Sequence, residues 1–230
     1  MKRFLVVDDN AAFAENLAEI LRDGGAEVSV AESGAAALEL ARAARFDALV
    51  TDMRMPVMSG ARLVHEILRV DPGLPAIVVT AYTGESDLRA AREEGLLSVL
   101  PKPVPLERLT DLLGKARRDG LVALVEDDPA LADNLAEALC ERGFSAVMAH
   151  SVAETERLGG VRPFAALVDL RLPGGPDGAA LQRLREKFPA LPILIMSAHR
   201  DALAQIGLAP VFPKPFDTAG LLLELEKLWR

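Results

Sequence analysis

The sequence has few of the features that mark secreted, membrane-spanning or nucleic-acid-binding proteins. Only one of its 230 residues is a cysteine, and 4% are aromatic. A single cysteine, Cys140, cannot build a disulfide framework, which fits a reducing compartment. Charged residues interrupt the first ten positions, so no signal-peptide hydrophobic segment is expected there. The longest apolar runs are far shorter than the roughly 20 residues of a membrane span. We therefore expect a cytoplasmic protein that does not enter the membrane.

Clusters of positive charge are missing as well. The formal net charge is -8, and no Lys/Arg-rich run is evident, which argues against direct nucleic-acid binding. Hydrophobic residues make up 50% of the chain, which is enough to build real cores, and the scarcity of aromatic residues predicts that these cores are aliphatic. The length allows one large domain or two small ones.

The chain does contain an internal duplication. Four pairs of similar segments recur in the same order: 11–21 with 129–139, 48–56 with 166–173, 74–82 with 191–199, and 100–103 with 212–215. The first pair reads AAFAENLAEIL and PALADNLAEAL. Such self-similarity indicates two copies of one domain. We place the first domain at 1–118 and the second at 119–230, joined by a linker too short for free tumbling.

Each half alternates short apolar runs with helical patterns. In the first half, strands are expected near 4–7, 26–30, 48–51, 76–80 and 98–100, and helices near 11–23, 33–44, 59–70, 85–94 and 106–117. Ser33 and Ser59 stand where helices could begin, and Gly24 and Gly25 stand where one could end. Five β-α units in each half predict an α/β fold with a doubly wound parallel sheet and helices on both faces.

Polar residues follow the predicted strands. In the first half Asp8 and Asp9 end the first strand, Asp52 ends the third, Thr80 ends the fourth, and Lys102 follows the fifth. The second half repeats this order with Glu126, Asp127, Asp169, Ser197 and Lys214. Because ligands of such sheets bind beyond the carboxyl ends of the strands, each set is expected to surround one crevice.

The chemistry of these residue types points to phosphoryl transfer. Clustered carboxylates repel one another, and a hard divalent cation with oxygen ligands, such as Mg²⁺, compensates for this repulsion. A carboxylate can attack phosphorus and form an aspartyl phosphate. A metal ion and a lysine ammonium can neutralise the charge of the transferring group. A Thr or Ser hydroxyl can then bind a phosphate oxygen.

The ordered pattern of DD, D-x-x-x-P, T and KP resembles the receiver domain of bacterial two-component response regulators, once in each half. The resemblance implies two flavodoxin-like (βα)5 domains in tandem. It implies that Asp52 and Asp169 accept the phosphoryl group. It also implies that the switch hydroxyls and the phosphoryl-binding lysines are, in the two halves respectively, Thr80 and Ser197, and Lys102 and Lys214.

The same resemblance implies Mg²⁺ as the cofactor. Its ligands in the first half would be Asp8, Asp9, Asp52 and the backbone carbonyl of Arg54. Its ligands in the second half would be Glu126, Asp127, Asp169 and the backbone carbonyl of Arg171. Both Lys-Pro bonds, at Lys102-Pro103 and Lys214-Pro215, resemble the family's cis-proline site.

The function implied by the resemblance is that of a stand-alone response regulator without a DNA-binding output domain. A sensor histidine kinase or a phosphotransfer protein would phosphorylate it, and it would act on a downstream protein target, with a homodimer as a further option. Its own chemistry would be self-phosphotransfer and autodephosphorylation. Two alternatives stay open. The chain could be a receiver-pair fragment of a larger hybrid kinase or effector regulator. It could also be an aspartyl-phosphate phosphatase, although Asp-Met-Arg at 52–54 lacks the second acid of such enzymes.

The sequence departs from the family pattern in three places. Valine stands where members carry an aromatic residue, at Val99 and Val211. Tyr82 and His199, two residues after the switch hydroxyls, predict different phosphate lifetimes in the two halves. The switch hydroxyl and the lysine are 22 residues apart in the first half but 17 apart in the second. Because more than one helical turn is missing, we expect a shortened fourth helix in the second half. In the family, the face built from the fourth helix, the fifth strand and the fifth helix is the usual dimerisation surface. We therefore expect that the second half does not dimerise through this face in the usual way.

Overall fold

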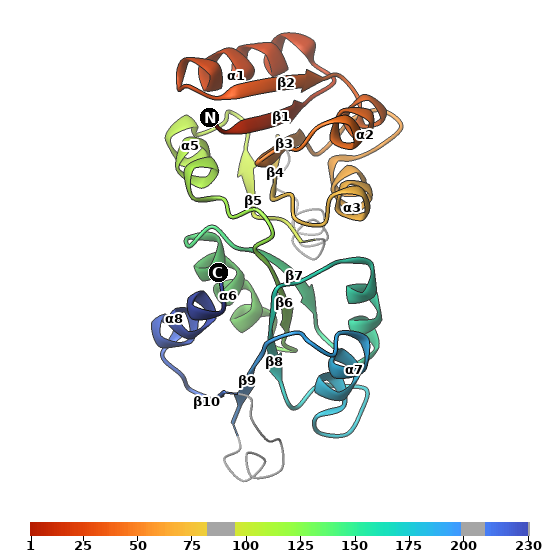
Figure 1. Ribbon diagram of the computed structural model, residues 1–230, viewed down its shortest axis with the longest axis vertical. Helices are drawn as coiled ribbons and strands as arrows, with labels where there is room; N and C mark the ends of the chain where they lie inside the picture. Colours follow the sequence, from red (N-terminus) through yellow and green to blue (C-terminus); the bar gives the residue numbers. More distant parts are fainter. Residues whose placement is uncertain (82–94, 199–209, 230) are drawn as a thin grey trace.

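The computed structural model describes residues 1–81, 95–198 and 210–229, which form two parallel five-stranded sheets (Figure 1). The first sheet has the order β2-β1-β3-β4-β5, with β1 (Arg3–Val7), β2 (Glu27–Ala31), β3 (Ala48–Asp52), β4 (Ala76–Thr80) and β5 (Ser98–Pro101). The second has the order β10-β9-β8-β6-β7, with β6 (Leu121–Val125), β7 (Ser145–Ala149), β8 (Ala165–Asp169), β9 (Ile193–Ser197) and β10 (Val211–Pro213). The two flavodoxin-like sheets in tandem confirm the predicted fold class.

The helices of the first half begin and end where the sequence signals predict. They are α1 (Ala11–Asp23), α2 (Gly34–Ala43), α3 (Gly60–Val70) and α5 (Leu106–Lys115). Ser33 and Ser59 cap α2 and α3, because their hydroxyls accept backbone hydrogen bonds from Ala36 and Arg62. Gly24 ends α1, and the following Gly25 has a positive φ of 87°. The helix expected near 85–94 lies outside the described residues.

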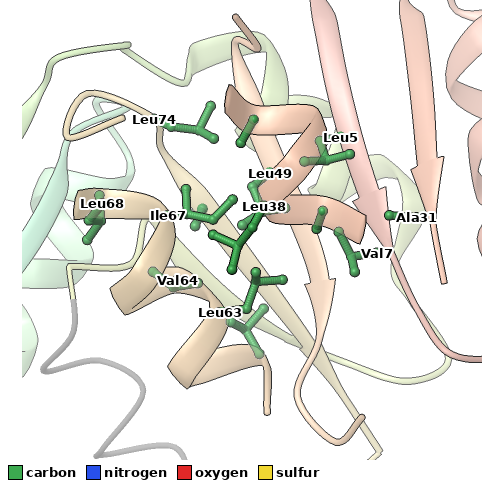
Figure 2. Packing of buried hydrophobic residues seen from close by; sticks show 14 of the residues in the cluster. Leu5, Val7, Ala31, Leu38, Leu49, Leu63, Val64, Ile67, Leu68 and Leu74 are labelled. Carbon is green, nitrogen blue, oxygen red and sulfur yellow. The ribbon is translucent and has the colours of Figure 1, made fainter. Parts of the chain in front are cut away.

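The core of the first half is aliphatic and lies on both faces of the sheet. Leu5 and Val7 pack with α2 and α3, while the alternate residues Phe4 and Val6 pack with α1 and α5. Figure 2 shows the cluster between the sheet and α2 and α3, where Leu49 is fully buried. Burying one such side chain contributes about 1.5–3 kcal/mol. Packing on both faces fixes the plane of the sheet and therefore the position of its polar edge.

The second half has one crossover that differs from the predicted pattern. Its helices are α6 (Pro129–Cys140), the 3₁₀ helix η1 (Ala153–Gly160), α7 (Ala179–Lys187) and α8 (Thr218–Leu228). In the corresponding place the first half has an α-helix. Gly159 and Gly160 disfavour an α-helix, and the Thr155 hydroxyl donates to the Val152 carbonyl within the turn. The predicted shortening of the fourth helix falls on residues outside the described part of the chain.

A short linker joins the two sheets, since α5 ends at Lys115 and β6 begins at Leu121. Arg118 forms hydrogen bonds with both carboxylate oxygens of Asp71 in the first half. The neighbouring Arg117 lies over the ring of Phe144 in the second half, 4.4 Å from its centroid. The linker is therefore held by both halves, while the boundary between 118 and 119 stays a prediction. No helix in the described ranges is long and apolar enough to cross a membrane.

Candidate functional site

The predicted polar residues of the first half meet at one edge of its sheet. Asp8 directly follows β1, Asp52 is the last residue of β3, Thr80 is the last residue of β4, and Lys102 directly follows β5. These four strands are neighbours in a parallel sheet, so their carboxyl ends lie side by side. The side chains of Asp8, Asp52 and Thr80 are buried, and Asp9 beside them is exposed.

Lys102 joins the two buried carboxylates of this site. Its Nζ lies 2.6 Å from Asp8 Oδ2 and 2.6 Å from Asp52 Oδ1. Burial disfavours the ammonium, but its hydrogen bonds to Asp52 and Asp8 outweigh this effect and raise the pKa of Lys102 above 10.5. The lysine thus stays charged and compensates two acids that would be costly to bury unpaired.

The remaining carboxylate oxygens accept backbone hydrogen bonds. Asp8 Oδ1 accepts from the Asn10 amide at 2.9 Å, and Asp52 Oδ2 accepts from the Arg54 amide at 2.5 Å. These contacts hold the Arg54 peptide next to Asp52. Whether the Arg54 carbonyl is a metal ligand stays a prediction.

The second half repeats the arrangement with a longer acid. Lys214 Nζ lies 2.9 and 2.6 Å from the two oxygens of Glu126 and 2.5 Å from Asp169 Oδ2. The Arg171 amide donates to Asp169 Oδ1 at 3.0 Å, as Arg54 does to Asp52.

Two groups of this second site, Glu126 and Lys214, have shifted pKa values. Burial raises the pKa of Glu126 above 4.5, although the hydrogen bonds from Lys214 act against it. Burial disfavours the ammonium of Lys214, but its hydrogen bonds to Asp169 and Glu126 prevail and raise its pKa above 10.5. Burial thus keeps the proton on Glu126 to higher pH, and the hydrogen bonds to the two carboxylates keep the proton on Lys214 to higher pH.

The acidic residues of the second half are grouped closely enough to hold a cation. One oxygen from each of Glu126, Asp127 and Asp169 lies within 4.8 Å of the others. Carboxylate oxygens are the donors that Mg²⁺ prefers, so the residues fit this ion. Within the described parts of the chain, Asp8, Asp9 and Asp52 do not form so close a group.

Both Lys-Pro peptide bonds are cis, at Lys102-Pro103 and Lys214-Pro215, as the resemblance implies. The two valines that replace the expected aromatic residue are partly buried. Val99 packs on the core of the first half and Val211 on that of the second. Tyr82 and His199 lie outside the described residues.

Two residues of the sites were not predicted from the sequence. His150 Nδ1 lies 2.8 Å from the Glu126 carbonyl oxygen, and the ring of Phe13 lies beside Lys102 with its centroid 4.3 Å from Nζ. Both contacts join segments that are far apart in the chain. In the sequence, these two residues are marked by a difference in residue type between the repeats, since Phe13 aligns with Leu131 and His150 with Glu32.

Comparison with known proteins follows the same division into halves. The response regulator receiver domain family matches twice, over residues 4–114 and 122–226. A response regulator receiver protein of Anaeromyxobacter sp. (strain Fw109-5) is 62% identical over 230 residues, covering 100% of this chain and 96% of that protein.

Other relatives match over part of the chain. The transcriptional regulatory protein GlrR of Escherichia coli (strain K12) is 34% identical over 138 residues, which cover 60% of this chain and 30% of GlrR. The chemotaxis protein CheY4 of Vibrio cholerae has a TM-score of 0.47 and 31% identity, over 50% of this chain and 97% of CheY4. The two family matches and the relative of nearly equal length show that the chain belongs to the response regulator receiver family, with one receiver domain in each half.

Proposed function

We propose that this response regulator accepts phosphoryl groups on Asp52 and Asp169. The observation that carries the proposal is the same in both halves. At the end of the central strand of each sheet, one buried carboxylate lies beside a lysine ammonium, 2.6 Å away in the first half and 2.5 Å away in the second. A second acid binds the same lysine. This arrangement suits a nucleophile whose product carries additional negative charge.

The phosphodonor in the cell would be a histidine kinase or a phosphotransfer protein, as for receiver domains in general. An Asp52 or Asp169 oxygen forms the new O–P bond while the N–P bond of the donor's phosphohistidine breaks, and the imidazole leaves. Lys102 and Lys214 neutralise the charge on the phosphoryl oxygens. Thr80 and Ser197, buried at the ends of the adjacent strands β4 and β9, supply a hydroxyl for one of those oxygens.

The acids around each acceptor would hold Mg²⁺. The ligands are Asp8, Asp9, Asp52 and the Arg54 carbonyl in the first half, and Glu126, Asp127, Asp169 and the Arg171 carbonyl in the second. The convergence of three carboxylates in the second half supports this assignment. When bound, the ion supplies positive charge that stabilises the transferring group.

Signalling would follow through protein contacts in the cytoplasm. Phosphorylation can shift a two-state equilibrium only by the difference in free energy that it gives the two states. The proposed chemistry is self-phosphotransfer and autodephosphorylation, without turnover of an external substrate. The domains would divide at 118/119, and each would present its own acceptor to a kinase or a downstream protein.

The proposal is tested by labelling the full chain with a radioactive small phosphodonor, with Mg²⁺ and with EDTA. We expect Asp52→Asn and Asp169→Asn each to lose part of the label, and EDTA to suppress all of it. Asp9 and Asp127 should contribute through the metal alone, so Asn at either position should raise the Mg²⁺ concentration needed for labelling without removing the acceptor. Full labelling of the chain that carries both Asp52→Asn and Asp169→Asn would refute the proposal.

A further inference from the structure

Phe13 contacts Lys102, although it is neither a phosphoryl acceptor nor a metal ligand in the proposed function. Its ring centroid lies 4.3 Å from the ammonium nitrogen. Phe13 is in the first turn of α1, where its amide donates to the side chain of the cap residue Asn10 at 3.1 Å. The residue is partly buried against the core on this face of the sheet. Lys102 is therefore surrounded by two carboxylates and an aromatic face.

The second half has no aromatic residue in this place. Leu131 occupies the same position in the first turn of α6, since its amide donates to the cap residue Asp128 at 3.3 Å. No aromatic ring lies over Lys214 in the parts of the chain that the structure describes. Instead, Lys214 binds both oxygens of Glu126, at 2.9 and 2.6 Å.

Both arrangements hold a lysine ammonium in place beside the acceptor aspartate. Asp8 is shorter than Glu126 by one methylene, and it gives one oxygen to Lys102 and the other to the Asn10 amide. The face of an aromatic ring attracts a cation, and more strongly where water is excluded. A ring is not a ligand for a hard cation, so it stays available to the lysine when the carboxylates also serve a metal.

Building on the proposed function, we propose that Phe13 is a positioning residue that holds Lys102 against Asp52. The second site reaches the same result with the longer carboxylate of Glu126. The first site thus combines the ring of Phe13 with the shorter Asp8, and the second site combines Leu131 with the longer Glu126. Because of the Phe13 ring, the position of Lys102 depends less on Asp8 than the position of Lys214 depends on Glu126.

The test uses the full chain with Asp169→Asn, so that only Asp52 takes up label from a small phosphodonor with Mg²⁺. We expect Phe13→Leu, which copies Leu131, to slow labelling by about 3- to 10-fold. Phe13→Trp keeps an aromatic face and should label within about twofold of the native rate. Adding Asp8→Glu to Phe13→Leu should restore part of the lost rate. As the matched control, Leu131→Phe in an Asp52→Asn chain should leave labelling of Asp169 unchanged, because Lys214 already binds two Glu126 oxygens.

A second readout is independent of phosphorylation. In the metal-free chain, the ring current of Phe13 should shift the NMR signals of the Lys102 side-chain protons, and Phe13→Leu should abolish that shift while Phe13→Trp retains one. The inference is overturned if Phe13→Leu labels at the native rate, or if Phe13→Trp is as slow as Phe13→Leu. Failure of the native Asp52 to take up label would refute the proposed function instead, and the NMR shift would still report the contact.

Discussion

At the scale of single residues, each site is a small network in which one lysine serves two buried acids. Lys102 and Lys214 have side chains that are 22% and 19% exposed, so water screens them only in part. Removing one partner of a buried ion pair costs more than the pair contributes, because the remaining charge is left without compensation. The lysines are therefore expected to matter for stability as well as for phosphoryl transfer.

We predict that Lys102→Met destabilises the metal-free protein by about 2–3 kcal/mol, because Asp8 and Asp52 lose their common cation. Urea denaturation of the full chain in EDTA measures this change. Addition of Mg²⁺ should reduce the difference in free energy of unfolding between Lys102→Met and the native chain, since the metal ion can compensate the same carboxylates. Lys115→Met is the control, because its pair with Asp111 is exposed and should contribute less than about 1 kcal/mol. Equal effects of the two substitutions would show that the buried acids do not depend on Lys102 for their charge compensation.

Glu126 should make stability depend on pH. Its pKa is raised in the folded protein, so the proton-bound form stabilises the fold below pH 4.5, and this contribution is lost as the pH rises through the folded pKa. Gln at this position does not titrate. In EDTA, the stability of Glu126→Gln relative to the native chain should therefore increase as the pH rises from 4.5 toward neutrality. Urea denaturation across that range measures the difference, and a change in the opposite direction would show that pairing with Lys214 outweighs burial.

At the scale of helices and strands, local sequence signals explain most of the fold. Short apolar runs became strands, and Ser33 and Ser59 cap helices, because these choices depend on near neighbours. The 3₁₀ helix η1 shows the limit. The duplication suggested an α-helix there, but two glycines near its end lower the helical propensity of the segment. The contacts of Phe13 and His150 depend on how distant elements pack, so no local pattern could predict them.

The start of α6 directly follows two acids of the second site. Asp128 caps this helix by accepting hydrogen bonds from the amides of Ala130 and Leu131, and it directly follows Glu126 and Asp127. We predict that Asp128→Ala lowers the free energy of unfolding by about 1 kcal/mol. The same substitution should weaken Mg²⁺ binding at the second site, because the cap no longer fixes the backbone that follows Glu126 and Asp127.

Glu137→Ala in the exposed middle of α6 is the matched control. It should change stability by less than about 0.5 kcal/mol and leave Mg²⁺ binding unchanged. Calorimetric titration of Mg²⁺ together with urea denaturation separates the two effects. If Asp128→Ala behaves like this control in both measurements, the cap does not support the site.

At the scale of the whole molecule, the linker holds the two receiver domains through adjacent arginines. Arg118 and Asp71 have side chains that are only 17% and 12% exposed, and Arg118 also donates to the Phe46 carbonyl. Arg117 lies over Phe144 and pairs with Glu226 at 3.2 Å. One linker arginine thus binds each half of the chain.

We predict that Arg118→Met lowers the free energy of unfolding of the full chain by about 2 kcal/mol, because Asp71 is left partly buried without its cation. Arg69→Met is the control, since Arg69 is exposed and lies 3.8 Å from the partly buried Glu66, and it should change stability by less than about 0.5 kcal/mol. Urea denaturation of both variants compares them. A loss no larger than that of the control would mean that the linker contact does not stabilise the chain.

Intact-mass measurement can count whether the chain carries two independent phosphoryl acceptors. The full chain is incubated with excess small phosphodonor and Mg²⁺, and the phosphoryl groups on each molecule are counted. We expect two groups on the native chain, one on Asp52→Asn, one on Asp169→Asn, and none when both substitutions are combined. A second group on either single variant, or any group on the combined variant, would contradict this expectation.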